Sequence, residues 1–197
     1  MIISTLKQFN WVDIFVVVIL IRVCWAAVKG GFLAEFFKIL GTIAAIYLAL
    51  HYYTGLSDSI GERIPFKNVP LDFLDFVFFI VLAITGYLLF VVLRQAILKF
   101  INMEPIAQLN KWGGLILGIT RAFLLSSLLI FMLLISSISY LKNSVINSFS
   151  GEYFSKIAPG VYASIWNGVT SKFMVKEKFN QTVLEAGISS QPKDKSK

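Results

Sequence analysis

Apolar residues along this chain gather in four long runs, which cover residues 11–28, 32–53, 73–93 and 115–138. Each run is close to the roughly 20 residues that an α-helix needs to cross the ~30 Å hydrocarbon core of a bilayer. The pattern therefore predicts an all-α, polytopic membrane protein with four transmembrane helices. A partly helical, amphipathic C-terminal tail is expected to follow them.

Composition strengthens this interpretation. Apolar residues make up 57% of the 197 residues and charged residues only 15%, whereas soluble domains have about 45–50% and about 25%. Such a small charged fraction cannot cover a water-facing surface, which excludes an ordinary soluble enzyme. A disulfide scaffold is also excluded, because Cys24 is the single cysteine.

The net charge of +7 is explained by membrane topology rather than by nucleic-acid binding. The 18 lysines and arginines lie at the ends of the apolar runs or in the C-terminal tail, which is the placement that membrane insertion requires. The expected partners are therefore the lipid bilayer and further membrane proteins, including copies of this chain, and not nucleic acid.

The first apolar run contains two charges, Asp13 and Arg22. Its Val, Ile, Leu and Phe residues favour insertion by roughly 3 to 6 kcal/mol, and a central Arg opposes it by about 2.5 to 3.5 kcal/mol. The run is therefore expected to insert as a helix. The same two charges interrupt the apolar core that a cleaved signal peptide would need.

The polar segments between and after the apolar runs indicate how the chain is organised. The turn Lys29-Gly30-Gly31 is so short that the first two helices are expected to form an antiparallel hairpin. Residues 54–72 contain two Gly and two Pro residues and predict an irregular loop, and residues 94–114 form a third connection with Pro105 and a polar stretch. The expected organisation is an N-terminal segment 1–10, a four-helix membrane domain 11–141 and a basic C-terminal tail 142–197.

The lysine and arginine positions also predict the orientation, because these residues accumulate on the cytoplasmic side of membrane proteins. The side with the first and third connections holds seven near the membrane: Arg22, Lys29, Lys38, Arg94, Lys99, Lys111 and Arg121. The other side holds five: Lys7, Arg63, Lys67, Lys142 and Lys156. The first side is therefore expected to be cytoplasmic, with both termini on the opposite, periplasmic side.

The tail has its own apolar pattern. Tyr162, Trp166, Val169 and Phe173 recur at spacings of four, three and four residues, which places them along one helix face after the break at Pro159-Gly160. This face could lie in the membrane interface or pack on the loops of the protein itself. The composition of residues 191–197 is typical of disorder.

Charged residues within the predicted helices need an explanation, because they are costly in lipid. Arg22, Glu35 and Lys38 lie at similar distances from the Gly30-Gly31 turn, so they are expected at similar depths of the hairpin. A carboxylate between two cations would stay ionised and would hold the hairpin together. Two alternatives remain: Arg22 and Lys38 extend to the membrane surface, or the three residues line a transport pathway.

Two acidic residues are expected at helix N-termini. Asp13 and Asp75 fall in the first turns predicted for the first and third helices, on the same side of the membrane. A negative charge there complements the helix dipole, and Asp is a favourable capping residue. This structural role accounts for both residues without a proton relay.

A packing seam is predicted at the start of the fourth helix. Gly114 and Gly118 form a Gly-x-x-x-Gly motif, which lets another helix approach closely. Arg121 lies two turns after Gly114, and therefore on nearly the same face. A cation beside such a seam is not expected to face lipid.

Motifs for chemistry are scarce. His51 is the only histidine, and it lies near a membrane interface beside two tyrosines, where a polar anchor is the simpler role. The sequence has no Gly-x-Ser-x-Gly motif, no second cysteine for a thiol relay and no phosphate-binding loop. We therefore expect no enzyme activity, no metal and no cofactor.

Four segments resemble the CvpA family, the colicin V production proteins. Asn10-Trp11-Val12-Asp13 is similar to the Trp-x-Asp start of that family, and residues 29–35 (KGGFLAE) are similar to its basic-Gly-Phe-x-x-Glu turn. Residues 51–54 (HYYT) resemble a stretch of some members. Residues 110–121 (NKWGGLILGITR) resemble the Asp/Asn-basic-x-x-Gly-x-x-x-Gly-x-x-Arg signature. Gly30 stands where Arg is usual in the family, and Ala122 stands where Gly often follows.

The resemblance covers about residues 10–140 and leaves the tail unexplained. It implies a multi-pass protein of the bacterial inner membrane that takes part in colicin V production or export and in envelope homeostasis. It does not imply a reaction. The expected role is a non-enzymatic accessory or assembly factor acting through helix–helix contacts, and the alternative is a subunit of a small oligomeric channel or transporter.

Overall fold

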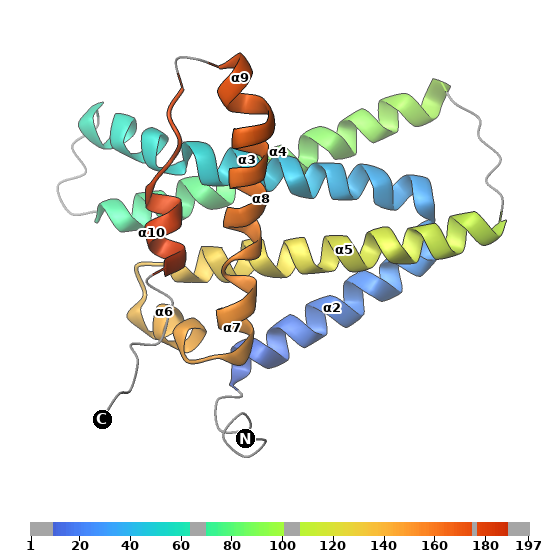
Figure 1. The fold of residues 1–197 in the computed structure, drawn as a ribbon, viewed down its shortest axis with the longest axis horizontal. Helices are drawn as coiled ribbons and strands as arrows, with labels where there is room; N and C mark the ends of the chain where they lie inside the picture. Colours follow the sequence, from blue (N-terminus) through green and yellow to red (C-terminus); the bar gives the residue numbers. More distant parts are fainter. Residues whose placement is uncertain (1–9, 64–69, 101–106, 175–176, 189–197) are drawn as a thin grey trace.

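A computed structural model describes residues 10–63, 70–100, 107–174 and 177–188 of the chain, and every regular element in these ranges is helical (Figure 1). Four long helices are apolar enough to cross a membrane: α2 (Trp11–Gly30), α3 (Phe32–Arg63), α4 (Leu71–Phe100) and α5 (Ala107–Leu134). The prediction of an all-α protein with four candidate spans is confirmed. The N-terminal residues and the predicted disordered end lie outside the described residues.

The tail is largely helical. Its elements are α6 (Ser139–Ile146), α7 (Phe149–Phe154), α8 (Ile157–Ile165), the π-helix η1 (Trp166–Thr170), α9 (Ser171–Phe173) and α10 (Thr182–Ile188). The expected interruption of the helix at Pro159-Gly160 is not present, because both residues lie within α8. Pro159 lies in the first turn of α8, where a missing backbone N–H is tolerated.

All four long helices extend beyond the apolar runs at one end or both, and α5 begins at Ala107 rather than at 115 and ends at Leu134 rather than at 138. Helix α3 continues for ten residues past Tyr53 through Gly55 and Gly61, and α4 begins at Leu71 rather than at 73. The extension of α3 packs along the first turns of α4: the Tyr53 and Phe79 rings lie edge to face, and the Ser57 hydroxyl donates a hydrogen bond to Asp75. These contacts favour helix where the sequence predicted an irregular loop.

The long helices pack in the order α2, α5, α3, α4. Helix α3 packs against α4 on one side and α5 on the other, and α2 packs against α5 (Figure 1). The expected antiparallel hairpin of the first two helices is therefore open. Helices α2 and α3 meet at the turn at Gly31, diverge from it, and hold α5 between them.

Glycines make this order possible, because their missing side chains leave room for close backbone contact. A Cβ at Gly114 would lie 2.9 Å from the Gly31 carbonyl carbon, and a Cβ at Gly118 would lie 2.1 Å from the Ala27 Cβ. The Gly-x-x-x-Gly motif of α5 is thus filled by α2 and the turn of the same chain. Gly86 of α4 fits against the backbone of Ala45 in α3.

The tail folds back over one end of the bundle. In Figure 1 the run from α8 to α9 crosses α3 and α5, and α6 and α7 lie near the start of α2. The apolar core joins this cover to the spans, since Ala158 and Tyr162 of α8 are buried with Leu50 of α3 and Phe131 of α5. The tail is part of the folded membrane domain.

Two glycine substitutions should have opposite effects on stability. Gly86→Ala places a Cβ 2.8 Å from the Ala45 Cα, and such overpacking typically costs about 1–3 kcal/mol. Gly55→Ala adds a Cβ within α3 with no atom within 4 Å, and should stabilise the helix by about 0.5–1 kcal/mol. Thermal unfolding in detergent measures both. Equal melting temperatures for the two variants would contradict this packing of α3 on α4.

Candidate functional site

A fully buried carboxylate lies where α2, α3 and α5 converge. Glu35, in the first turn of α3, has 0% of its surface exposed. The Lys38 Nζ donates a hydrogen bond of 2.7 Å to its Oε1, and the Arg121 Nε of α5 lies 2.9 Å from its Oε2. We call Glu35, Lys38 and Arg121 the Glu35 cluster.

The geometry within the Glu35 cluster differs between its two ion pairs. The Nε–H of Arg121 is not aligned with Oε2, so this contact is an ion pair without a hydrogen bond. Arg121 is buried with 6% of its surface exposed, whereas the Lys38 side chain is 23% exposed. Removing one partner of a buried ion pair is strongly destabilising, because it leaves the other charge uncompensated in a poorly solvated site.

The membership of this cluster differs from the prediction in one residue. The sequence predicted Arg22, Glu35 and Lys38, but the Arg22 side chain is exposed on α2 and Arg121 lies beside Glu35 instead. The physical reason is the position of α5 between α2 and α3, which separates the two helices that were expected to pair. Gly118 permits that approach, because a Cβ at this position would lie 2.1 Å from the Ala27 Cβ.

The turn between α2 and α3 is fastened by a residue of α5. Gly31 has a φ of 74°, and a Cβ there would lie 2.3 Å from the Asn110 Oδ1. This Oδ1 accepts a 2.7 Å hydrogen bond from the Phe32 N–H. The N–H groups in the first turn of a helix have no partner within the helix, so this bond satisfies one of them. Gly30 is exposed, and the Lys29 ammonium lies 3.6 Å from the centre of the Trp25 ring.

Asp13 has a wider role than a helix-terminal charge. Asn10 caps α2, and the Asp13 carboxylate accepts a hydrogen bond from the Asn10 N–H, which completes a capping box. The other Asp13 oxygen accepts a 2.6 Å bond from the Ser150 N–H of α7, and the Asn10 amide donates to the Ser144 carbonyl. The start of α2 therefore binds the tail.

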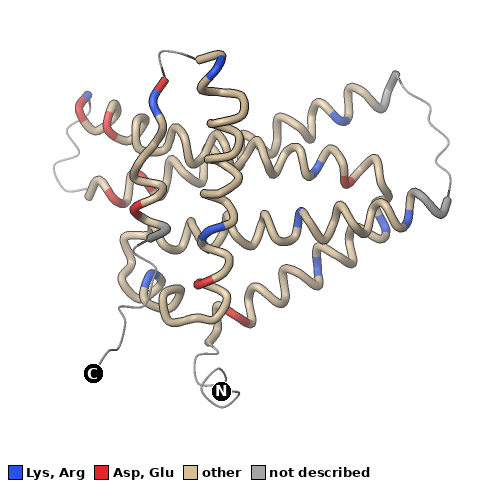
Figure 2. Tube along the Cα trace, in the orientation of Figure 1, with Lys and Arg blue, Asp and Glu red and all other residues tan. Residues whose placement is uncertain are grey.

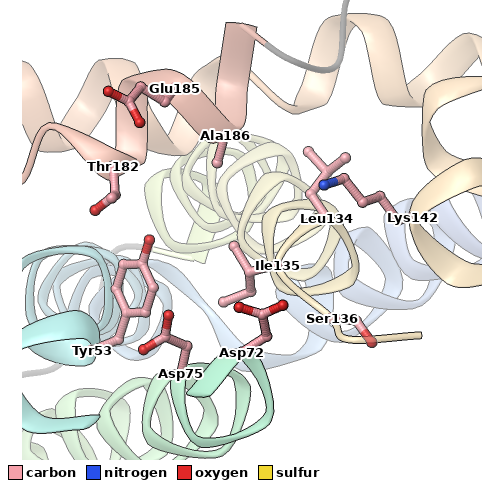
Figure 3. A pocket seen from close by; sticks show the side chains of 10 residues that line it. All are labelled: Tyr53, Asp72, Asp75, Leu134, Ile135, Ser136, Lys142, Thr182, Glu185 and Ala186. Atoms are coloured by element: carbon pink, nitrogen blue, oxygen red, sulfur yellow. The ribbon is translucent and has the colours of Figure 1, made fainter. Parts of the chain in front are cut away.

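Asp75 lies in the second turn of α4 because the helix begins at Leu71, and Asp72 occupies the first turn. Both line a pocket of about 470 Å³ between the helix ends and α10 (Figure 3). Figure 3 shows a third carboxylate, Glu185, and the cation of Lys142 around the same space. Across the described ranges, no three His, Cys, Asp or Glu side chains are grouped to hold a metal ion.

His51 lies in a clasp between α3 and the tail. Its Nδ1 is 2.9 Å from the Tyr162 hydroxyl, and its Nε2 contacts the Glu177 carboxylate. The ring stacks on Tyr47 and lies 5.3 Å from the Trp166 ring centre. Residues of the tail therefore contact both ring nitrogens of His51. The sequence could not predict these contacts, because it shows only that His51 stands beside two tyrosines.

The clasp continues to the segment before α10. The Asn180 N–H donates a 3.0 Å bond to the Tyr162 hydroxyl, and its side-chain amide donates 2.8 Å to the Leu50 carbonyl of α3. Burial raises the pKa of the Tyr162 phenol, and the Asn180 N–H opposes this change in part. A phenol is already protonated at neutral pH, and the raised pKa extends this state toward more alkaline pH. We call His51, Tyr162, Glu177 and Asn180 the His51 clasp.

The apolar stripe of the tail is buried in its first half and exposed in its second half. Tyr162 and Trp166 are buried against the bundle, whereas Val169 and Phe173 are 56% and 80% exposed. The π-helical turn between them changes the helical phase, so that Thr170 is buried in place of Val169. The junction of α7 and α8 is further held by Ser127 of α5, which accepts from the Ala158 N–H.

Comparison with known proteins identifies the family. A family model described as Colicin V production protein matches residues 12–159. The match covers most of the chain, including all four spans, and the chain belongs to this family. Neither the search of curated proteins nor the search of solved structures gives a match. Tyr162, Glu177 and Asn180, which complete the His51 clasp, lie after the matched range.

The Glu35–Arg121 pair can be tested by a double-mutant cycle. Glu35→Gln leaves the buried Arg121 charge with reduced compensation, and Arg121→Met does the same for Glu35, so each single variant should lose about 3–5 kcal/mol of stability. The double variant should lose clearly less than the sum of the two losses. Thermal unfolding in detergent gives the three values, with Arg22→Gln, at an exposed position of α2, as the control. Additive losses would contradict direct coupling.

Proposed function

We propose that this member of the colicin V production protein family is a non-enzymatic accessory factor of the bacterial inner membrane. It would act through helix–helix contacts, and its task would be the production or export of a colicin V type toxin together with envelope homeostasis. The family match supports the link to colicin V production. The accessory role is supported by the charged and small residues of the spans, because they pack the helices against one another.

The observation that carries this proposal is the closed Glu35 cluster. A channel or transporter subunit would need Glu35 and Arg121 to face a water-filled pathway. Instead the two side chains face each other, with 0% and 6% of their surfaces exposed. Their charges are therefore engaged in holding α3 to α5, which favours a packing role over a transport role.

The outer surfaces of α2 and α4 favour contacts within the membrane. Helix α4 packs mainly on α3, and α2 mainly on α5. Each leaves large apolar side chains uncovered, among them Ile21 and Trp25 on α2 and Leu88 and Val92 on α4. Such surfaces suit lipid and the helices of other membrane proteins.

The distribution of charge supports an orientation with the Gly31 turn in the cytoplasm and the termini in the periplasm. Figure 2 shows most acidic positions gathered toward the end away from this turn, whereas cationic positions lie at both ends. Near the turn, the described cationic side chains are Arg22, Lys29, Lys38, Arg94, Lys111 and Arg121. A cationic end is retained on the cytoplasmic side of the inner membrane.

A complementation assay tests the proposed role. The chain should restore colicin V release to a bacterial strain that lacks its own family member. Gly118→Ala should abolish the restoration, because the new Cβ would lie 2.1 Å from the Ala27 Cβ and would displace α5. Adding Ala27→Gly removes that clash and should recover release.

Membrane levels of each variant, measured by immunoblotting, serve as the control for this assay. If the unsubstituted chain accumulates in the membrane without restoring release, the role in colicin V production is wrong. If Gly118→Ala restores release fully, the seam between α2 and α5 is not required for the activity.

Reporter fusions test the orientation. A periplasmic phosphatase joined after Lys197 should be active, and a fluorescent protein that folds only in the cytoplasm should be dark at the same position. The same reporters inserted between residues 101 and 106 should give the reverse pattern. A fluorescent C-terminal fusion would place the termini in the cytoplasm and contradict the proposed orientation.

A further inference from the structure

Arg22 lies on the side of α2 that faces away from the rest of the protein. Arg22, Trp25 and Lys29 follow each other at spacings of three and four, so they share one side of the helix. All three are exposed, as is Val18 one turn earlier. The buried residues Val16 and Ala27 mark the opposite side, which packs against α5. Arg22 therefore points toward the surrounding membrane.

The depth of Arg22 makes this exposure unfavourable. Arg22 is 11 residues after Trp11 and eight before Gly30, which corresponds to about 16 Å and about 12 Å from the two helix ends. Its Cα–Cβ bond tilts toward the N-terminus of α2, away from the nearer end. Arg22 therefore lies inside the candidate span Trp11–Gly30, in the half nearer the Gly31 turn but not at the end of the span, and an exposed cation inside a span is costly.

This chain supplies no counter-charge for Arg22. Within the part of the chain that the structure describes, Arg22 has no ion-pair or hydrogen-bond partner. The carboxylate at a similar depth, Glu35, is fully buried and paired with Lys38 and Arg121. A second copy of the chain has the same arrangement, so its Glu35 is equally unavailable.

We infer that the Arg22 side of α2 docks a transmembrane helix of another protein, and that this helix carries an Asp or Glu at the depth of Arg22. The inference rests on the proposed accessory function and names the chemistry of its partner. A carboxylate on a partner helix can reach this depth, whereas lipid phosphates lie toward the end of the span, where Lys29 is seven residues or about 10 Å further along α2. The apolar Val18 and Ile21 would pack beside the ion pair.

A reconstituted system with a defined helix tests this inference. The protein, labelled at its C-terminus, is placed in phosphatidylcholine vesicles at mildly alkaline pH with a labelled leucine helix of about 24 residues. The helix carries one central Glu or, for comparison, one central Gln. Energy transfer between the labels should show about threefold to thirtyfold tighter association with the Glu helix.

Variants of α2 assign this preference to a residue. Arg22→Leu should bind both helices equally, whereas Lys29→Gln, which removes the cation at the end of the same helix side, should keep the preference. Arg22 makes no contact with the packed side of α2, so thermal unfolding of Arg22→Leu should match that of the unsubstituted protein. If the Arg22→Leu variant unfolds at a different temperature, two other variants are used in its place. Arg22→Gln should lose the preference for the Glu helix, and Arg22→Lys should keep it.

The remaining outcomes overturn the inference. Equal association of the Glu and Gln helices with the unsubstituted protein shows that Arg22 does not select a carboxylate. Loss of the preference when phosphatidylglycerol is added assigns the site to a lipid headgroup. Because vesicles without colicin V are used, a failed complementation assay would remove the proposed function and leave this measurement unaffected.

Discussion

The close approach of α5 to the end of α2 determines the arrangement of the membrane domain. It depends on the absence of side-chain atoms at Gly114 and Gly118, since a Cβ at either position would overlap with the turn or with Ala27. With α5 in this position, Arg121 reaches Glu35 and Asn110 reaches the start of α3. Packing thus creates the environment in which a buried carboxylate is tolerated, and the ion pair in turn joins α3 to α5.

A second set of polar contacts makes the tail part of the same structure. Buried donors and acceptors need partners, and here they are exchanged between spans and tail. Asp13 of α2 binds the backbone of α7, Ser127 of α5 binds the backbone of α8, and His51 of α3 is enclosed by Tyr162 and Glu177. Each span except α4 therefore has at least one polar contact with the tail among these bonds.

The sequence was sufficient for the spans, because their length and apolarity are local properties. It also placed Arg121 in phase with the glycines of α5, which is a property of one helix. The order in which the helices pack side by side could not be predicted from such local properties. A Gly-x-x-x-Gly motif indicates that a helix approaches but not which one, and counting residues from the turn gives Arg22 a suitable depth for Glu35. The His51 clasp joins residues more than 100 positions apart, and only tertiary structure brings them together.

The dependence of the spans on the tail has a consequence for biosynthesis. Helices α2 to α5 leave the ribosome before residues 144–180 emerge from it, so Asp13, Ser127 and His51 have no partners from the tail during much of translation. Final closure of the domain is therefore a late step, which occurs only after the tail has been synthesised. A chaperone or quality-control protease has a defined interval in which the unfinished chain, with its polar side chains uncovered, differs from the mature protein.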